Sequence, residues 1–138
     1  MVDSSVVVKW LFDEPRSDIA LGLLNGRQHE FHAPDLFLLE VINVVNKRVR
    51  RNLLPLADAI PVCESIPMLP IRRHPFHQEL KAAFEVATRT GMSVYDAVFL
   101  ALAVRLDVRF VTDDERALQS MMSSEYGRYP KRLRDFQP

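Results

Sequence analysis

Residues 93–118 read SVYDAVFLALAVRLDVRFVTDDERAL, and this stretch decides the fold. It begins with Ser93, a residue type favoured at helix N-caps, and continues in the uninterrupted apolar run 97–104. A run that is apolar on all sides predicts a buried helix, which we place through Leu106. After the turn at Asp107, VRFVT (108–112) is short and rich in β-branched and aromatic residues, so it predicts a strand.

The rest of the chain alternates in the same way between helical and strand-like segments. Over 36–51, apolar residues at positions 38, 41, 42, 45 and 49 follow the spacing of an amphipathic helix. The segment VVVKWLF (6–12) fits either a strand or a helix capped by Ser4 or Ser5. The other expected elements are a short helix ending near Gly26, a helix over 56–64, a short strand MLPI (68–71), and a helix from Phe76 that ends at Gly91.

Helices that alternate with short strands predict the fold class. Such units form right-handed crossovers and place helices on both faces of a parallel sheet. We therefore expect an α/β, three-layer fold with a central, mainly parallel sheet flanked by helices. The 138 residues suit a single domain, 1–138, and 48% apolar and 26% charged residues are typical of a globular protein.

Charge and cysteine content exclude several classes of protein. The net charge is zero, which excludes binding of nucleic acid by bulk positive charge but leaves room for a local basic patch. Cys63 is the single cysteine, which excludes an internal disulfide and a Cys-rich zinc site. The start MVDSSVVVKW does not resemble a signal peptide, and the longest apolar run falls short of the ~18 residues that span a bilayer. We expect a cytoplasmic protein without a membrane segment.

Four carboxylates are placed to share one rim of the predicted sheet. Asp3 and the pair Asp113-Asp114 follow predicted strands, and ligands of such sheets bind outside the carboxyl ends of the strands. Asp96 lies in the first turn of its helix, where backbone N–H groups favour a carboxylate. Glu40 interrupts the apolar run LFLLEVINVV. It begins a polar stripe on its helix that continues through Asn43, Lys47 and Arg50 or Arg51.

Acids that share one cleft raise one another's pKa unless a cation offsets their charge. A hard divalent cation such as Mg²⁺ or Mn²⁺ takes oxygen ligands, commonly keeps several waters, and accepts phosphate oxygens in its shell. The acidic residues therefore predict a metal ion, and the metal ion predicts a substrate that contains phosphate.

Each acid also has a purely structural explanation. Asp96 can complete a capping box with Ser93, and Asp3 and the acids at 113–115 can be ordinary strand-end or N-cap residues. Glu40 equally suits the surface edge of its apolar stripe. Taken one at a time these explanations are at least as good as a functional one, and only the joint placement of the acids favours a site.

The basic and histidine residues carry weaker signals. The cations at 47–51 lie at a predicted helix C-terminus, where the macrodipole favours positive charge. We prefer this explanation of the basic cluster to contact with an RNA backbone. The histidines at 29, 32, 74 and 77 lack the helical spacing of metal ligands and suit surface or cap positions.

Four segments occur in a characteristic order along the chain. They are VDSSVVVKW with Asp3, APDLFLLEVINVVNK with Glu40, SVYDAVFLALAVRLDVRFVTDDERAL with Asp96 and Asp114, and the closing YPKRLRDF. Together they resemble the PIN-domain ribonucleases, and within them the VapC-type toxins of bacterial toxin–antitoxin pairs, over nearly the whole chain. In that family the third acid lies in a Y-D-A-like element and the fourth in T-x-D. Here Tyr95-Asp96-Ala97 and Thr112-Asp113-Asp114 take those places.

The resemblance implies a set of catalytic residues, namely Asp3, Glu40, Asp96 and Asp114, that hold one or two Mg²⁺ or Mn²⁺ ions. It implies an endoribonuclease that hydrolyses phosphodiesters by metal-activated water. Asp114 matches the pattern better than Asp113, to which we assign a supporting role, although the choice between the two stays open. Thr112 is expected to donate its hydroxyl to a carboxylate, and Asn43 to orient Glu40 or to contact phosphate. Few residues precede Asp3, so fraying of the first strand would weaken that ligand.

The resemblance also implies partners: an RNA substrate, a cognate antitoxin that blocks the acidic site, and a second copy of the chain in a homodimer. Two other functions fit the same residues. One is a catalytically silent PIN-like module that binds RNA or protein. The other is a Mg²⁺-dependent phosphate enzyme of a different α/β family, against which neither a D-x-D-x-T element nor a G-x-x-x-x-G-K-[ST] loop occurs.

Overall fold

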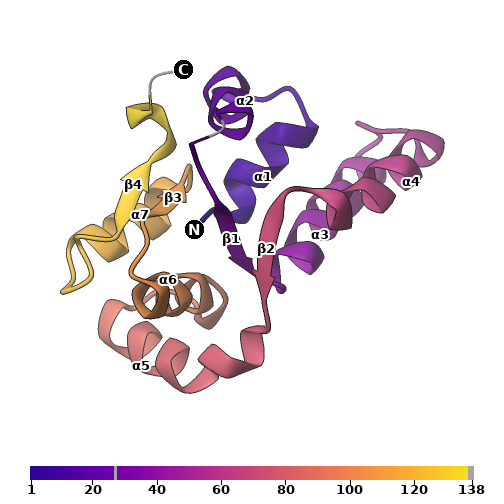
Figure 1. Ribbon diagram of the computed structural model, residues 1–138. Helices are drawn as coiled ribbons and strands as arrows, with labels where there is room; N and C mark the ends of the chain where they lie inside the picture. Colours follow the sequence, from indigo (N-terminus) through magenta and orange to yellow (C-terminus); the bar gives the residue numbers. More distant parts are fainter. Residues whose placement is uncertain (27, 137–138) are drawn as a thin grey trace.

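The computed structural model describes residues 1–26 and 28–136. Helices and short strands alternate along the chain (Figure 1). The elements are α1 (Ser4–Leu11), α2 (Ser17–Asn25), β1 (Phe31–Pro34), α3 (Phe37–Arg50), α4 (Leu56–Ser65), η1 (Ile66–Met68), β2 (Ile71–His74), η2 (Phe76–Glu79), α5 (Leu80–Thr90), α6 (Val94–Leu106), β3 (Phe110–Thr112), α7 (Glu115–Met122), β4 (Pro130–Arg132) and η3 (Leu133–Asp135).

The strands form two parallel pairs that the N-terminal residues join. β1 pairs with β2, and β3 pairs with β4. Between the pairs, the N–H of Val2 donates to the carbonyl of His32 at 3.0 Å, and Val2 forms a parallel bridge with Val111. The N–H of Asp3 donates to the carbonyl of Val111, also at 3.0 Å. Asp3 thus leaves the sheet beside the end of β3.

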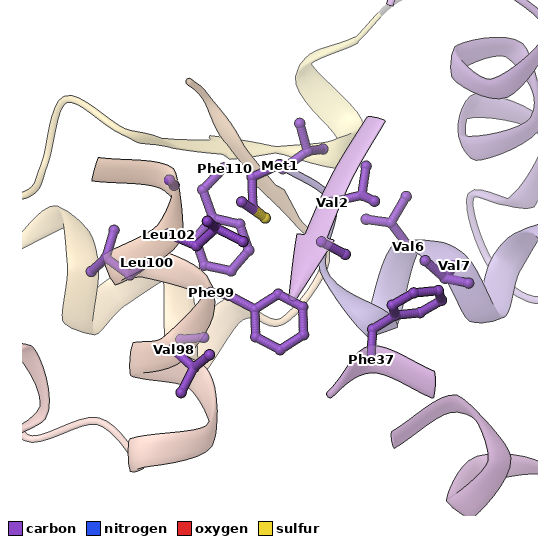
Figure 2. Packing of buried hydrophobic residues seen from close by; sticks show 14 of the residues in the cluster. Met1, Val2, Val6, Val7, Phe37, Val98, Phe99, Leu100, Leu102 and Phe110 are labelled. Carbon is purple, nitrogen blue, oxygen red and sulfur yellow. The ribbon is translucent and has the colours of Figure 1, made fainter. Parts of the chain in front are cut away.

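Helices cover both faces of these strands. α6 packs against β1 and β3, and α1 packs against β3 and α3. Figure 2 shows Phe99 and Leu102 on one side of the strands and Val6 and Val7 on the other. All four side chains are buried, because both helices turn apolar surface towards the strands. The predicted α/β fold, with helices flanking a parallel sheet, is confirmed.

Most of the predicted helices are confirmed. Ser93 caps α6 by accepting a hydrogen bond from the N–H of Asp96, and Gly91 ends α5 with a positive φ of 73°. A β-carbon is disfavoured at that φ, which explains the glycine. The ambiguous segment 6–12 is helical through Leu11, with Phe12 as the C-cap, and the N-cap of α1 is Asp3 rather than Ser4 or Ser5.

The predicted strand over 68–71 was wrong. Met68 ends the 3-10 turn η1, and β2 begins only at Ile71. The next two residues of β2, Arg72 and Arg73, are exposed, so the strand lacks the apolar run that the prediction relied on. Strand β1 and helix α7 had no predicted counterpart. Within residues 1–26 and 28–136, no helix combines the length and apolar character that a membrane span requires.

Candidate active site

Asp3 occupies the centre of a group of hydroxyl donors at the end of the sheet. Its Oδ2 accepts hydrogen bonds from Ser5 Oγ and from Thr112 Oγ1, each at 2.7 Å. Thr112 is almost fully buried, so its hydroxyl is held in place by the packing around β3. Burial raises the pKa of Asp3, and the two hydrogen bonds oppose that rise without cancelling it.

Glu40 reaches the same region from the first turn of α3. Its side chain is half-buried, and its Oε2 accepts a hydrogen bond from Ser4 Oγ on α1. Burial raises the pKa of Glu40 from 4.5 to about 7. The charges of Asp3 and Asp96 add to this rise, after the larger effect of burial.

Asp96 lies in the first turn of α6, as the sequence predicts. Ser93 Oγ donates to Asp96 Oδ2 at 2.6 Å and accepts from the backbone N–H of Asp96 at 3.1 Å. Ser93 therefore caps α6, and the Asp96 carboxylate accepts a hydrogen bond from the Ser93 hydroxyl. The charge of Asp96 also raises the pKa of Asp3. Asp96 can therefore bond to the N-cap of its helix and also belong to the acidic group.

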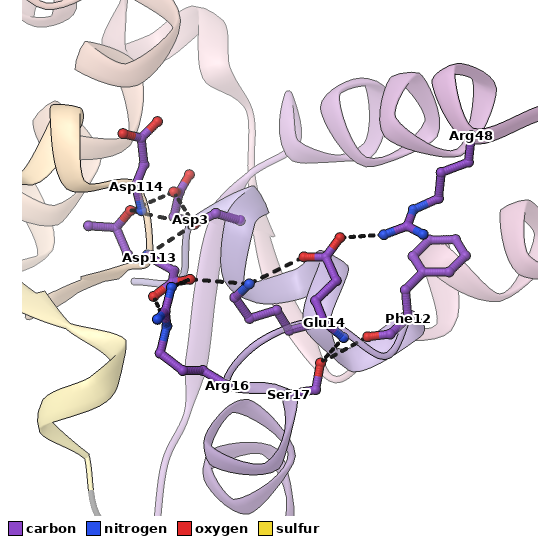
Figure 3. Close-up of polar contacts among 11 residues, drawn as sticks. Asp3, Phe12, Glu14, Arg16, Ser17, Arg48, Asp113 and Asp114 are labelled. Carbon is purple, nitrogen blue, oxygen red and sulfur yellow. Dashed lines mark hydrogen bonds and ion pairs between the residues drawn. The ribbon is translucent and has the colours of Figure 1, made fainter. Parts of the chain in front are cut away.

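The neighbouring aspartates after β3 have different surroundings. Asp113 accepts bonds from both Nε and Nη2 of Arg16 at 2.8 Å, and Lys9 Nζ lies 3.1 Å from its Oδ2. Burial alone acts to raise the pKa of Asp113, but these two cations hold it below its ordinary value. Figure 3 shows the Asp113 carboxylate directed towards Arg16 and the Asp114 carboxylate directed away from it.

Asp114 is exposed and caps helix α7. Its Oδ1 accepts hydrogen bonds from the N–H groups of Arg116 and Ala117, at 2.8 and 3.0 Å. Asp114 and Asp96 line the same hollow, which has a volume of about 200 Å³. The backbone N–H of Asp114 also donates to Thr112 Oγ1 at 3.0 Å, which connects it to the hydroxyl that holds Asp3.

Two supporting residues were not recognised from the sequence. Ser5 Oγ accepts a hydrogen bond from the N–H of Asp113 at 3.0 Å and donates to Asp3, so it links the two strand ends. Lys9 is buried, with Nζ at 3.2 Å from Glu14 Oε2 and close to Asp113. The sequence did contain a signal for Lys9, because it is a charged residue within the apolar run of α1. Asn43 is exposed on α3, one turn beyond Glu40.

Oxygen is the donor atom in every one of these acids, which suits a hard divalent cation. Burial raises the pKa of Asp3 and of Glu40, and a bound cation would favour the charged form of each carboxylate. Among the residues that the structure describes, no three His, Cys, Asp or Glu side chains come close enough to enclose a metal ion. Because Mg²⁺ commonly keeps several waters, carboxylates spaced in this way still fit such an ion.

Fold and site together define a small α/β domain with carboxylates gathered at the carboxyl ends of its parallel strands. Residues 1–121 match the PIN domain, and the chain therefore belongs to the PIN-domain family. It is 32% identical over 118 residues to Ribonuclease VapC3 of Pyrobaculum aerophilum, covering 84% of this chain and 89% of that protein. It is 30% identical over 120 residues to Ribonuclease VapC12 of Mycobacterium tuberculosis, covering 87% and 90%. These similarities support a PIN-domain nuclease of the VapC type.

Proposed function

We propose that the protein is a Mg²⁺- or Mn²⁺-dependent endoribonuclease that acts as the toxin of a toxin–antitoxin pair. The observation that carries this proposal is that the fold brings acids from distant segments to one end of the sheet. Ser4, which follows Asp3, donates to Glu40, and Asp96 and Asp114 line one hollow. Thr112 bonds to both Asp3 and the backbone N–H of Asp114. Each of these acids has a local structural partner, but those local contacts do not explain why the acids lie in one region. A cation that they share would explain it.

The proposed metal-binding residues are Asp3, Glu40, Asp96 and Asp114. When bound, the cation supplies a Lewis acid for the phosphoryl oxygens and lowers the pKa of a coordinated water. The chain's own residues position the carboxylates. Ser5 and Thr112 hold Asp3, Ser4 orients Glu40, and Ser93 orients Asp96. Such outer partners fix ligand geometry and tune ligand basicity.

The relatives named Ribonuclease VapC support a cognate antitoxin as a partner, and we propose a homodimer in addition. A groove of about 270 Å³ between α3 and α4 is lined almost wholly by apolar residues, among them Ile42, Leu56 and Ile60. We propose it as part of the surface that an antitoxin covers. Phe76, Leu80 and Phe84 are exposed at successive turns of η2 and α5, which suits the interface of a homodimer in the cytoplasm.

The test is cleavage of total RNA by the purified protein with Mn²⁺, followed by mapping of the cleaved ends. We expect cleavage that EDTA abolishes and that Asp96→Asn reduces by at least about 100-fold. Asp107→Asn is the matched control, because Asp107 is an exposed acid before β3 with a positive φ of 51° that asparagine also adopts. Circular dichroism confirms that both variants are folded.

A silent RNA-binding module is the second candidate, because Asp114 caps α7 and Asp96 bonds to Ser93, the N-cap of α6. It predicts equal RNA binding by the wild type and Asp96→Asn, with no cleavage by either. Cleavage that persists in EDTA, or that Asp96→Asn leaves intact, would contradict the metal-dependent mechanism.

A further inference from the structure

Three exposed cations surround a hollow at the end of α3. Lys47, Arg50 and Arg51 line this hollow, whose volume is about 310 Å³. In the part of the chain that the structure describes, none of the three forms an ion pair. Arg48, which lies between them in sequence, pairs with Glu14 and covers the ring of Phe12. Arg48 has a structural role, whereas the other three cations have no ion-pair partner among residues 1–26 and 28–136.

Capping of the helix does not require these side chains. The N–H groups of Asn52 and Leu53 donate to the carbonyls of Val49 and Arg48, at 3.0 and 2.9 Å. Asn52 adopts a positive φ of 57°, so the backbone itself closes the end of α3. Lys47 and Arg51 are four residues apart, and like charges at this spacing destabilise a helix by roughly 0.2–0.5 kcal/mol. The macrodipole offsets that cost but does not account for the hollow.

Helix geometry relates this surface to the acidic site. Lys47 and Arg51 follow Glu40 by seven and eleven residues, which are close to two and three full helical turns. They therefore lie on nearly the same line along α3 as Glu40, about 10 and 16 Å away along the axis. In Figure 1, α3 and α4 extend together away from the strands, so this line leads outwards from the strand ends.

We propose that Lys47, Arg50 and Arg51 form a binding surface for the backbone phosphates of single-stranded RNA, a few nucleotides from the bond at the acidic site. This inference rests on the proposed ribonuclease function. The surface attracts an anionic chain to a protein of zero net charge, whose carboxylates repel RNA until a cation is bound. Because phosphate contacts carry no sequence information, the surface supplies affinity and direction rather than specificity.

The test measures binding of a fluorescein-labelled 12-nucleotide oligouridylate by fluorescence anisotropy in EDTA, between 50 and 200 mM salt. The variant is Lys47→Ala/Arg50→Ala/Arg51→Ala. The control, Lys81→Ala/Arg109→Ala/Arg128→Ala, removes the same charge from exposed sites; Arg109 and Arg128 precede β3 and β4, at the strand ends opposite the acids. Three lost phosphate contacts should reduce the slope of log affinity against log salt by about 2 and weaken binding at least about tenfold.

The outcomes separate the inference from the proposed function. Equal losses in the variant and the control would show a general charge effect and overturn the inference. Binding of a glutamate dodecapeptide that depends on the three cations, with RNA binding unaffected, would assign the surface to an acidic protein instead. Absence of Mn²⁺-dependent cleavage by the wild type overturns the proposed function but leaves the binding comparison readable. Cleavage by the wild type together with an unchanged salt slope in the variant overturns this inference alone.

Discussion

Asp113 and Asp114 are adjacent in sequence, yet their surroundings assign them different tasks. Two cations already surround the carboxylate of Asp113, which leaves it little capacity to bind another. Asp114 shares a hollow with Asp96, and two backbone N–H groups leave its second oxygen available. These surroundings favour Asp114 over Asp113 as the proposed metal ligand, and they give Asp113 a structural role in the turn that follows β3.

We predict that Asp113→Asn and Asp114→Asn separate stability from metal binding. Asp113→Asn removes the negative charge that pairs with buried Lys9, so it should lower the free energy of unfolding by about 1–3 kcal/mol. Asp114→Asn keeps a good N-cap, so its stability should change little while its Mn²⁺ affinity falls at least about tenfold. Urea unfolding and isothermal titration calorimetry measure the two effects. If Asp113→Asn loses more Mn²⁺ affinity than Asp114→Asn, the assignment is reversed.

Glu40 should make the metal-free protein less stable as pH rises. Its pKa is raised to about 7 in the folded state, against an ordinary value of 4.5. The folded state therefore binds more protons than the unfolded state between these values, and the free energy of unfolding falls as pH rises through them. We expect Glu40→Gln to remove about 1–2 kcal/mol of that fall, less than the full shift implies because solvent screens a half-buried carboxylate.

The measurement is urea unfolding in EDTA at several pH values between 4.5 and 7.5, for the wild type and Glu40→Gln. Parallel pH curves for the two proteins would contradict a raised pKa. Adding Mn²⁺ should restore wild-type stability at neutral pH, because a cation replaces the proton as the partner of the carboxylate.

At the scale of elements, local signals determined what could be predicted. Helix α6 and strand β3 were predicted because their apolar character is continuous and their caps are conventional residue types. Strand β1 has the sequence FHAP, and its histidine and proline are not typical of a strand. Only its pairing with β2 identifies it as one. Helix α7 has eight residues, too few for a periodic apolar pattern to emerge from sequence. Tertiary pairing, which a single sequence does not display, accounts for the omission of β1, and the shortness of α7 accounts for the other.

His32 and His74 join β1 to β2, although the sequence suggested surface or cap positions. Nδ1 of His32 lies 3.0 Å from Nε2 of His74, and the rings stack with centroids 5.2 Å apart. Burial lowers the pKa of both histidines. The cation of Arg72 adds to both effects, and the carboxylates of Glu30 and Glu79 oppose them at His32 and His74 respectively.

We predict that this histidine pair makes the fold sensitive to acid. Because the pKa of each histidine is lowered on folding, the unfolded state binds more protons below about pH 6.5, and stability is lost as pH falls through that range. His32→Asn/His74→Asn should reduce the fall in Tm between pH 7.5 and 5.5 by a few degrees, or roughly 1 kcal/mol. Scanning calorimetry of both proteins measures the difference. An identical fall in both would show that the pair does not titrate with folding.

In the molecule as a whole, the acidic site forms where strands end and the following helices begin. The parallel-sheet rule predicted that Asp3 and Asp114 reach one rim, and helix periodicity predicted that Glu40 interrupts an apolar face. Sequence alone did not reveal that Ser4, Ser5 and Thr112 would supply the hydroxyls that hold the acids. Those contacts depend on which strand lies beside which, and a serine after an aspartate is equally typical of a helix cap.

Substitutions of Val2 test whether strand pairing positions the acids, because the backbone of Val2 joins the two strand pairs. Val2→Pro removes the N–H that donates to His32 and places a proline at the bridge between the two strand pairs, which should cost about 3 kcal/mol or more. Val2→Ala keeps the hydrogen bonds and leaves a cavity, at a cost of about 1–3 kcal/mol. Where circular dichroism shows both variants folded, calorimetry should find Mn²⁺ affinity lost at least about tenfold in Val2→Pro and retained in Val2→Ala. Equal affinities would mean that the backbone pairing of Val2 does not position Asp3.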